Sequence, residues 1–382
     1  MSVLVVGAGL TGAVIARELA EAGLNVRVID QRGVIAGNCY TERDGETGVM
    51  MHRHGPHIFH TDNDRIWDYA NRFDTFRPIR CQVRATVGGQ VYSLPVNLHT
   101  INQFFGRAMG PEEARAFIAA RASGTMEEAR SFEDVALAGI GPELYKAFFH
   151  GYPIKQWGRD PKDIPASVLK RLPIRFDYDD NYFHHRRQAC PENGYTAFIG
   201  AILEHPSITV ELSRPYAGDA DREGHEHVFF SGGLDRWFDY RLGDLSYRTL
   251  DFEVSRHEGS FQGCAVMSYP EVEVPHTRIS EHMYFAPWDE VTGTVVFHEY
   301  SRDARRDDTL YYPLRLVNDK AVLGEYVKLA EEERGVTFVG RLGTYRYLDM
   351  DVCIEEALQT AAAYLGARGE GASVGAFVNR PL

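Results

Sequence analysis

The first thirty residues contain the pattern that most constrains the fold of this chain. An apolar run leads into Gly7-x-Gly9-x-x-Gly12, an amphipathic stretch follows, and a second apolar run ends at Asp30. This order predicts a buried strand, a tight turn, a helix and a second strand, which is the start of a Rossmann-like α/β domain.

The same pattern predicts a bound dinucleotide. Glycines at this spacing let a pyrophosphate approach the backbone at the N-terminus of the helix. Asp30 can accept hydrogen bonds from the adenosine ribose, and an acidic residue there disfavours a cofactor with a 2′-phosphate. No second complete pattern exists, because Gly139-x-Gly141 runs into Pro142 and residues 340–343 lack the spacing. We therefore expect one dinucleotide site.

Length and charge limit the classes of partner. The 382 residues predict two or three domains, and 44% hydrophobic with 25% charged residues is typical of a globular chain. A net charge of −13 disfavours nucleic acid and anionic lipid as partners. A small anionic substrate still fits if arginines face it locally.

Cysteine usage and hydropathy indicate a soluble cytoplasmic protein. The odd number and the wide spacing predict neither a disulfide framework nor a thiolate metal site. No apolar run approaches the roughly 18 residues of a membrane span. The five cysteines are Cys39, Cys81, Cys190, Cys264 and Cys353.

The rest of the chain predicts further structural types. Gly88-Gly89 between alternating apolar residues predicts a hairpin, and residues 99–151 read as helices, with Pro111, Ser131 and Pro142 near helix starts. Runs at 249–254, 264–269 and 294–300 predict an antiparallel sheet, followed by a strand at 338–340 and a helix at 350–365.

Four closely spaced histidines, His52, His54, His57 and His60, allow two interpretations. They could ligate a metal, but no carboxylate or thiol set accompanies them. Gly55-Pro56 interrupts any regular element there. We favour a loop that lines the cofactor, and no metal.

Aromatic and basic residues farther along are candidates for substrate binding. An aromatic group near Gly151 fits either core packing or stacking on a nucleobase. Ile164 to Pro173, punctuated by prolines and followed by Arg175, is expected to be a mobile loop. Hydrolase and P-loop motifs are absent, so a cofactor is expected to perform the chemistry. The remaining candidates are Lys170 and Arg171 on that loop, Arg278, and the tyrosines Tyr311, Tyr312, Tyr345 and Tyr347.

Nearly the whole chain resembles the bacterial UDP-galactopyranose mutases. The resemblance rests on the N-terminal VGAG and on longer motifs. These are IDQR at 29–32, GN at 37–38, GPHIFH at 55–60, NLHTINQFF at 97–105, IKQWG at 154–158, 169–173, YDDNYF at 178–183 and VGRLGTYRYLDMD at 339–351.

The resemblance implies a flavin-dependent, non-redox isomerisation of UDP-galactopyranose and UDP-galactofuranose. In this family N5 of reduced FAD attacks the anomeric carbon, UDP leaves, and the sugar recloses as a five-membered ring before UDP returns. It also implies a homodimer, an external reductant such as NAD(P)H, and galactofuranose supply for cell-wall polysaccharide.

The resemblance also implies roles for individual residues. FAD would contact the glycine loop (Gly7, Gly9, Thr11, Gly12), Asp30, Gln31, Gly37, Asn38, His57, Ile58, Arg341, Leu348, Asp349, Met350 and Asp351. His60 would lie near flavin and sugar, and Arg171 and Arg278 would bind the diphosphate. Substrate would also contact Phe148, Phe149, Tyr152, Trp157, Tyr182, Tyr312, Tyr347 and Asp349.

Three positions depart from the family pattern, and alternatives follow from them. Cys81 and Ser268 stand where Asn is common, and Pro153 stands where a Thr is common. The same ring contraction on UDP-N-acetylgalactose or dTDP-fucose is therefore open. An amine-oxidase type of redox flavoenzyme and a non-catalytic FAD-binding protein are the remaining alternatives.

The expected architecture is a discontinuous Rossmann-like FAD-binding domain with a helical insert and an antiparallel sheet domain. We assign 1–78, 190–240 and 330–382 to FAD binding, and 98–170 to the helical domain with its mobile loop. The sheet domain for substrate would comprise 79–97, 171–189 and 241–329.

Overall fold

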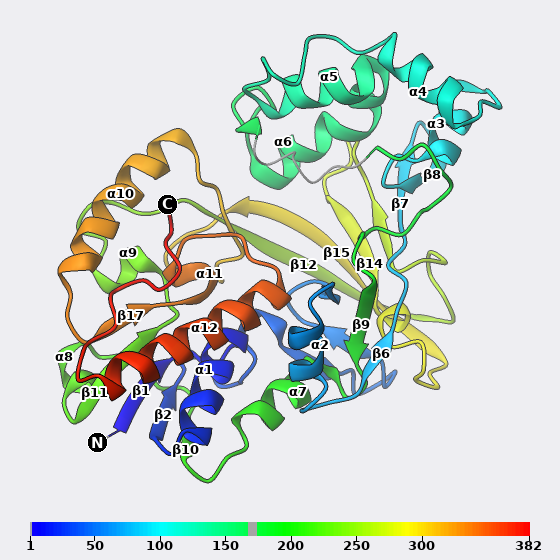
Figure 1. Ribbon diagram of the computed structural model, residues 1–382. Helices are drawn as coiled ribbons and strands as arrows, with labels where there is room; N and C mark the ends of the chain where they lie inside the picture. The colour runs from blue at the N-terminus through cyan, green and yellow to red at the C-terminus, as the bar shows by residue number, and fades with distance from the viewer. Residues whose placement is uncertain (1, 167–173) are drawn as a thin grey trace.

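The computed structural model describes residues 2–166 and 174–382. A parallel sheet of five strands unites the N-terminal segment with segments from the second half of the chain (Figure 1). Side chains alternate between its faces, since Val3 and Val5 join one apolar cluster and Leu4 and Val6 another. In spatial order the strands are β10 (Ile208–Glu211), β2 (Asn25–Ile29), β1 (Ser2–Val6), β11 (His225–Phe230) and β17 (Val336–Phe338).

Helices cover both faces of this sheet, as expected for a parallel sheet. On one face lie α1 (Leu10–Glu21), α7 (Gly194–Leu203) and α12 (Met350–Gly369). On the other lie α9 (Leu234–Trp237) and α10 (Val317–Glu332), and the remaining short helices of this part are α8 (Asp219–Arg222) and α11 (Gly340–Gly343). The predicted Rossmann-like unit is therefore confirmed, including the closing helix. The strand predicted at 338–340 lies two residues earlier, because Gly340 already begins α11.

A second sheet has seven strands and is antiparallel except at one pair. Its order is β16 (Tyr312–Pro313), β12 (Tyr247–Glu258), β15 (Gly293–Asp303), β14 (Arg278–Glu281), β13 (Val266–Ser268), β7 (Val83–Val87) and β8 (Gln90–Leu94). The hairpin at Gly88-Gly89 joins β7 to β8 as predicted. The predicted antiparallel sheet is therefore confirmed, and within the described residues it contains one parallel pair, β13 with β7.

The helical region projects from the end of the second sheet, far from α1 and α12 (Figure 1). It comprises α3 (Leu98–Phe105), α4 (Pro111–Ala119), α5 (Phe132–Leu144), the π-helical turn η2 (Tyr145–Phe149) and α6 (Gly151–Trp157). Ser131 and Asp134 form the predicted capping box of α5. Gly141, at φ 75°, breaks the helical path just before Pro142.

Smaller elements connect the two sheets. They are η1 (Gly37–Cys39), β3 (Thr41–Arg43) paired with β4 (Met50–His52), α2 (Asp64–Ala70), η4 (His282–Phe285), and the sheet of β5 (Phe59–Thr61), β9 (Arg187–Pro191) and β6 (Phe76–Pro78). Within the described ranges, no helix has both the length and the apolar character to cross a membrane. The domain boundaries given above remain a proposal.

Candidate active site

The glycine loop brings two stretches of backbone into unusually close approach. A Cβ on Gly12 would lie 2.0 Å from the carbonyl oxygen of Gly7, and Gly7 itself has φ +112°. A Cβ on Gly37 would lie 3.3 Å from the Cα of Gly9. Only glycine fits such contacts without movement of the chain. The loop and η1 thus form a cradle of bare backbone at the N-terminus of α1.

Charged residues just after strand β2 stabilise this cradle. The carboxylate of Asp30 accepts hydrogen bonds from the backbone N–H groups of Ala8 and Arg32, both at 2.8 Å. Nη2 of Arg32 donates to Oδ1 of Asn38 at 3.0 Å, whereas Nη1 is buried and has no hydrogen-bond partner among the described residues. A guanidinium with an orphaned donor beside a glycine cradle fits a dinucleotide phosphate. Gln31 is exposed.

Three other predicted cofactor residues come from separate segments, α1, α11 and the start of α12. Thr11 packs against Gly340, where an added Cβ would lie 3.2 Å from its hydroxyl oxygen. Arg341 donates from Nη2 to the carbonyl oxygen of Tyr311 at 2.8 Å, and its buried Nε has no partner within the described ranges. Asp349 is the N-cap residue of α12, which begins at Met350.

Each of the four clustered histidines has a partner of its own. His52 accepts from the backbone N–H of His57 at 3.0 Å, and the His57 ring donates to the carbonyl of Gly55 at 2.8 Å. Nδ1 of His54 lies 2.8 Å from the hydroxyl of Tyr311. Nδ1 of His60 lies 2.7 Å from Nδ1 of His185, and its ring stacks on Phe183 at 3.9 Å. In the part of the chain that the structure describes, no three His, Cys, Asp or Glu residues gather as metal ligands.

Burial keeps three of these rings neutral, and it lowers the pKa of His52 well below its usual value. Desolvation lowers the pKa of His54 to about 4 and that of His57 to about 4. The positive charges of Arg341 and Arg278 lower the pKa of His57 further. His57 therefore stands between the cofactor side of the site and Arg278.

Arg278 is the charged centre of the second half of the site. It opposes Glu299 across the β14–β15 pair, and both Nε and Nη2 lie 2.8 Å from Oε2 of that carboxylate. Glu299 is only 1% exposed. Burial opposes the charge of Arg278, but Glu299 and the nearby Tyr312 and Tyr152 outweigh it and raise its pKa well above the usual value. The guanidinium is held permanently charged.

Tyrosines from separate segments surround this arginine. Tyr312 stacks on Tyr347 with ring centroids 5.8 Å apart, and Trp157 approaches Tyr312 at 6.1 Å. Tyr182 and Tyr347 remain 42% and 45% exposed, so their rings are accessible. Burial raises the pKa of Tyr152 and keeps its hydroxyl protonated. The structure thus brings these predicted substrate residues together.

Other predicted residues lie elsewhere. Phe148 and Phe149 are buried in the apolar cluster of the helical region, where Phe148 packs on Tyr92 at 5.2 Å. The selection of Tyr345 as a candidate for substrate binding is wrong, because its hydroxyl donates to the carbonyl of Ser246 at 2.7 Å inside an apolar core. Arg171, Lys170 and all of the expected mobile loop after residue 166 lie outside the described residues.

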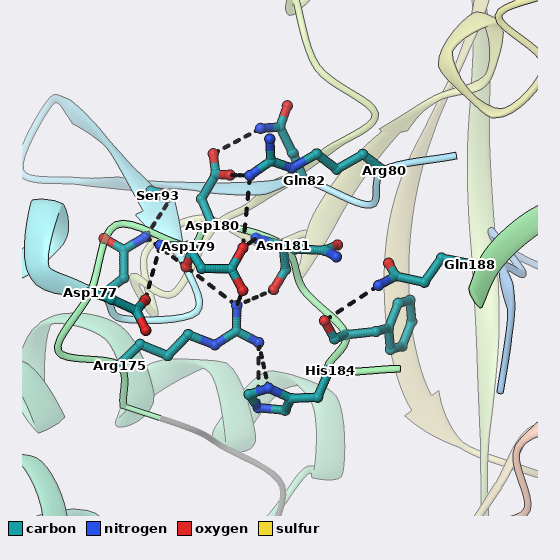
Figure 2. Close-up of polar contacts among 12 residues, drawn as sticks. Arg80, Gln82, Ser93, Arg175, Asp177, Asp179, Asp180, Asn181, His184 and Gln188 are labelled. Atoms are coloured by element: carbon teal, nitrogen blue, oxygen red, sulfur yellow. Dashed lines mark hydrogen bonds and ion pairs between the residues drawn. The ribbon is translucent and has the colours of Figure 1, made fainter. Parts of the chain in front are cut away.

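Arg175 holds the loop that carries Tyr182, a role that the sequence did not reveal. Figure 2 shows its guanidinium in contact with Asp179, Asn181 and His184. Nη1 donates to the carboxylate of Asp179 at 2.9 Å and to the carbonyl of Asn181, and Nη2 lies 3.2 Å from the ring of His184. Arg175 is 6% exposed. The available signal was the motif YDDNYF at 178–183, which supplies two of its partners, Asp179 and Asn181.

Comparisons with known proteins agree with this arrangement. The family model of UDP-galactopyranose mutase matches residues 147–347, and that of an NAD(P)-binding Rossmann-like domain matches residues 5–73. A probable UDP-galactopyranose mutase of Klebsiella pneumoniae is 54% identical over 364 residues, covering 95% of this chain and 94% of that relative. A dTDP-fucopyranose mutase of Escherichia coli is 51% identical over 369 residues, covering 95% and 98%.

A solved structure has the same fold. The crystal structure of a reduced UDP-galactopyranose mutase aligns with a TM-score of 0.75 at 15% identity, covering 99% of each chain. At that identity the likeness concerns the fold alone.

Proposed function

Because the chain belongs to the UDP-galactopyranose mutase family, an isomerase family, we propose that it interconverts UDP-galactopyranose and UDP-galactofuranose with reduced FAD as cofactor. The observation that carries the proposal is the meeting of Arg278 with Tyr152 and Tyr312 beside the neutral ring of His57. A fixed positive charge among hydroxyls suits a nucleotide diphosphate that leaves and returns.

FAD in its reduced form would supply the nucleophilic N5 for the anomeric carbon. The glycine cradle, Arg32 and Arg341 would bind its phosphates and fix its orientation. Arg278 would stabilise the negative charge of the departing diphosphate, and Arg171 would act with it. Trp157 and Tyr152 would bind the base, and Tyr182 and Tyr347 would line the sugar pocket.

A second candidate is the same reaction on a thymidine diphosphate sugar such as dTDP-fucose. The relative that bears this name is nearly as similar as the UDP-galactopyranose relative. Two of the three departures from the family pattern lie next to the site. Ser268 opposes Arg278 in the β13–β14 pair, and the carbonyl of Cys81 accepts from the backbone N–H of Tyr182 at 2.8 Å. Smaller or apolar groups there would alter selection of the sugar.

The test is chromatography of UDP-galactofuranose incubated with the purified protein, with and without dithionite, while flavin absorbance is followed. We expect UDP-galactopyranose only in the reduced sample, without net oxidation of the flavin. If only a dTDP sugar or UDP-N-acetylgalactose reacts, the substrate is corrected. Net substrate oxidation, or no turnover of any of these by the reduced protein, would overturn the mutase assignment.

The resemblance supports two further proposals, a homodimeric state and NAD(P)H or a reduced carrier as the source of electrons. The cysteine usage supports a third, a cytoplasmic location. Analytical ultracentrifugation, anaerobic reduction followed by absorbance, and cell fractionation test them in turn.

A further inference from the structure

Lys155, in α6, occupies an unusual cage of backbone oxygens. Its Nζ donates to the carbonyls of Glu271 at 2.8 Å, Val274 at 2.9 Å and His276 at 3.0 Å, and also to that of Tyr269. An ammonium group has three donors, so four carbonyls saturate it. Desolvation lowers its pKa to about 8, and the group still carries its charge at pH 7.

The cage belongs to one loop, residues 269–276, which joins two strands of the site. Ser268 ends β13 just before this loop, and Arg278 begins β14 just after it. The loop closes on itself through the backbone N–H of Tyr269 and the carbonyl of Thr277 at 3.0 Å. Holding the carbonyl of His276 therefore fixes the backbone two residues before Arg278.

Helix α6 also packs closely against the loop 269–276 at Gly151. A Cβ on Gly151 would lie 2.2 Å from the carbonyl oxygen of Pro270 and 2.8 Å from Val272. The other end of α6 is held by Arg248, which donates to the carbonyls of Gln156 at 2.9 Å and Lys155 at 3.1 Å. These contacts at both ends of α6 together fix the position of this helix relative to β14.

We propose that Lys155 is a positioning residue that sets the separation between the nucleoside subsite on α6 and the diphosphate-binding Arg278. This inference rests on the proposed function, since both subsites belong to it. Tyr152 and Trp157 lie on the same short helix as Lys155, and Arg278 lies at the end of the caged loop. A ligand that spans both subsites depends on their separation, whereas a nucleoside alone does not.

The test compares uridine with UDP, or thymidine with dTDP if wild type binds the latter diphosphate more tightly. In K155M the carbonyl cage loses its donor, and the loop is no longer tied to α6. We expect the diphosphate to bind about tenfold more weakly, which corresponds to about 1.4 kcal/mol. The nucleoside should bind within twofold of wild type, and FAD content should be unchanged. K162M is the matched control, because Lys162 is 72% exposed on the same region.

An equal loss for nucleoside and diphosphate, or no loss for either, would overturn the positioning role. K155R keeps a charged donor and should restore part of the diphosphate affinity. G151A moves the loop while Lys155 remains, so it should reproduce the selective loss, and it serves if K155M does not fold. Wild type that binds neither diphosphate would refute the proposed function itself, which separates the two failures.

Discussion

The two halves of the candidate site differ in the atoms that form them: backbone atoms form the cofactor end, and side chains form the region around Arg278. At the cofactor end, glycines a few residues apart bring backbone against backbone, as where Gly12 faces the carbonyl of Gly7. Around Arg278, the site consists of side chains from α6, β14, β15 and β16 that meet only in the folded molecule. Addition of a Cβ atom to the glycine cradle should therefore impair cofactor binding. Removal of the charge of Arg278 should instead impair turnover.

The largest effect is expected from G12A. Its new Cβ would lie 2.0 Å from a backbone oxygen, so the glycine cradle must open. We expect protein purified without flavin, measured as the ratio of absorbance at flavin and protein wavelengths. G324A is the control, because Gly324 also lies in a helix and its Cβ would meet no atom within 4 Å. A G12A protein with a full complement of flavin would refute this view of the cradle.

R278M should retain its flavin and lose turnover by about a hundredfold to a thousandfold, because a preorganised charge facing the leaving diphosphate is gone. Steady-state kinetics of the reduced enzyme measure the change. Near-normal turnover would remove Arg278 from the diphosphate site, and loss of flavin would show that the two halves are not independent.

The same substitution should also destabilise the fold. Glu299 is 1% exposed, and without Arg278 it becomes a buried carboxylate with no counter-charge. We expect a loss of about 3 kcal/mol in the free energy of unfolding. The double variant R278M/E299Q should recover most of the stability in urea titrations but none of the turnover. Parallel recovery of both would mean that the arginine acts only on folding.

Low pH should reduce the free energy of unfolding, because His57, between the two halves of the site, is buried as a neutral ring. The pKa of His57 is about 4 in the folded protein, below its ordinary value of 6.5. Between these values the unfolded chain binds a proton that the folded protein refuses. Stability is therefore complete above pH 6.5 and falls by about 1.4 kcal/mol per pH unit below it for this histidine. Urea unfolding of H57N should show a shallower dependence, and H99N, at an exposed histidine, should match wild type.

The smallest effect is expected from C81N. Burial raises the pKa of the Cys81 thiol to about 12, so this uncharged sulfur faces Tyr182 and Arg278 in place of an amide. The amide should change relative kcat/KM for UDP-galactose and dTDP-fucose by about tenfold or less. An unchanged ratio would remove Cys81 from sugar selection.

The difference between the two halves also explains which features could be predicted from the sequence and which could not. The glycine loop, the hairpin and the capping box are local, so spacing alone identifies them. The pairing of Arg278 with Glu299 depends on strand register, which no motif encodes. Tyr345 and Tyr347 seemed equivalent in the sequence. The backbone of Tyr345 adopts φ 47°, and this residue lies in the core while Tyr347 reaches the site.

The pairing of β13 with β7, the one parallel pair in the second sheet, has a consequence for biosynthesis. Val266 pairs with Val83, just as Val6 pairs with Phe230 in the first sheet, and β17 completes that sheet only at residue 338. Each sheet is thus interrupted by strands of the other. Such non-local contacts close late and raise the contact order. Co-translational folding of one domain before the other is therefore disfavoured, because the first sheet is complete only after residue 338 has left the ribosome.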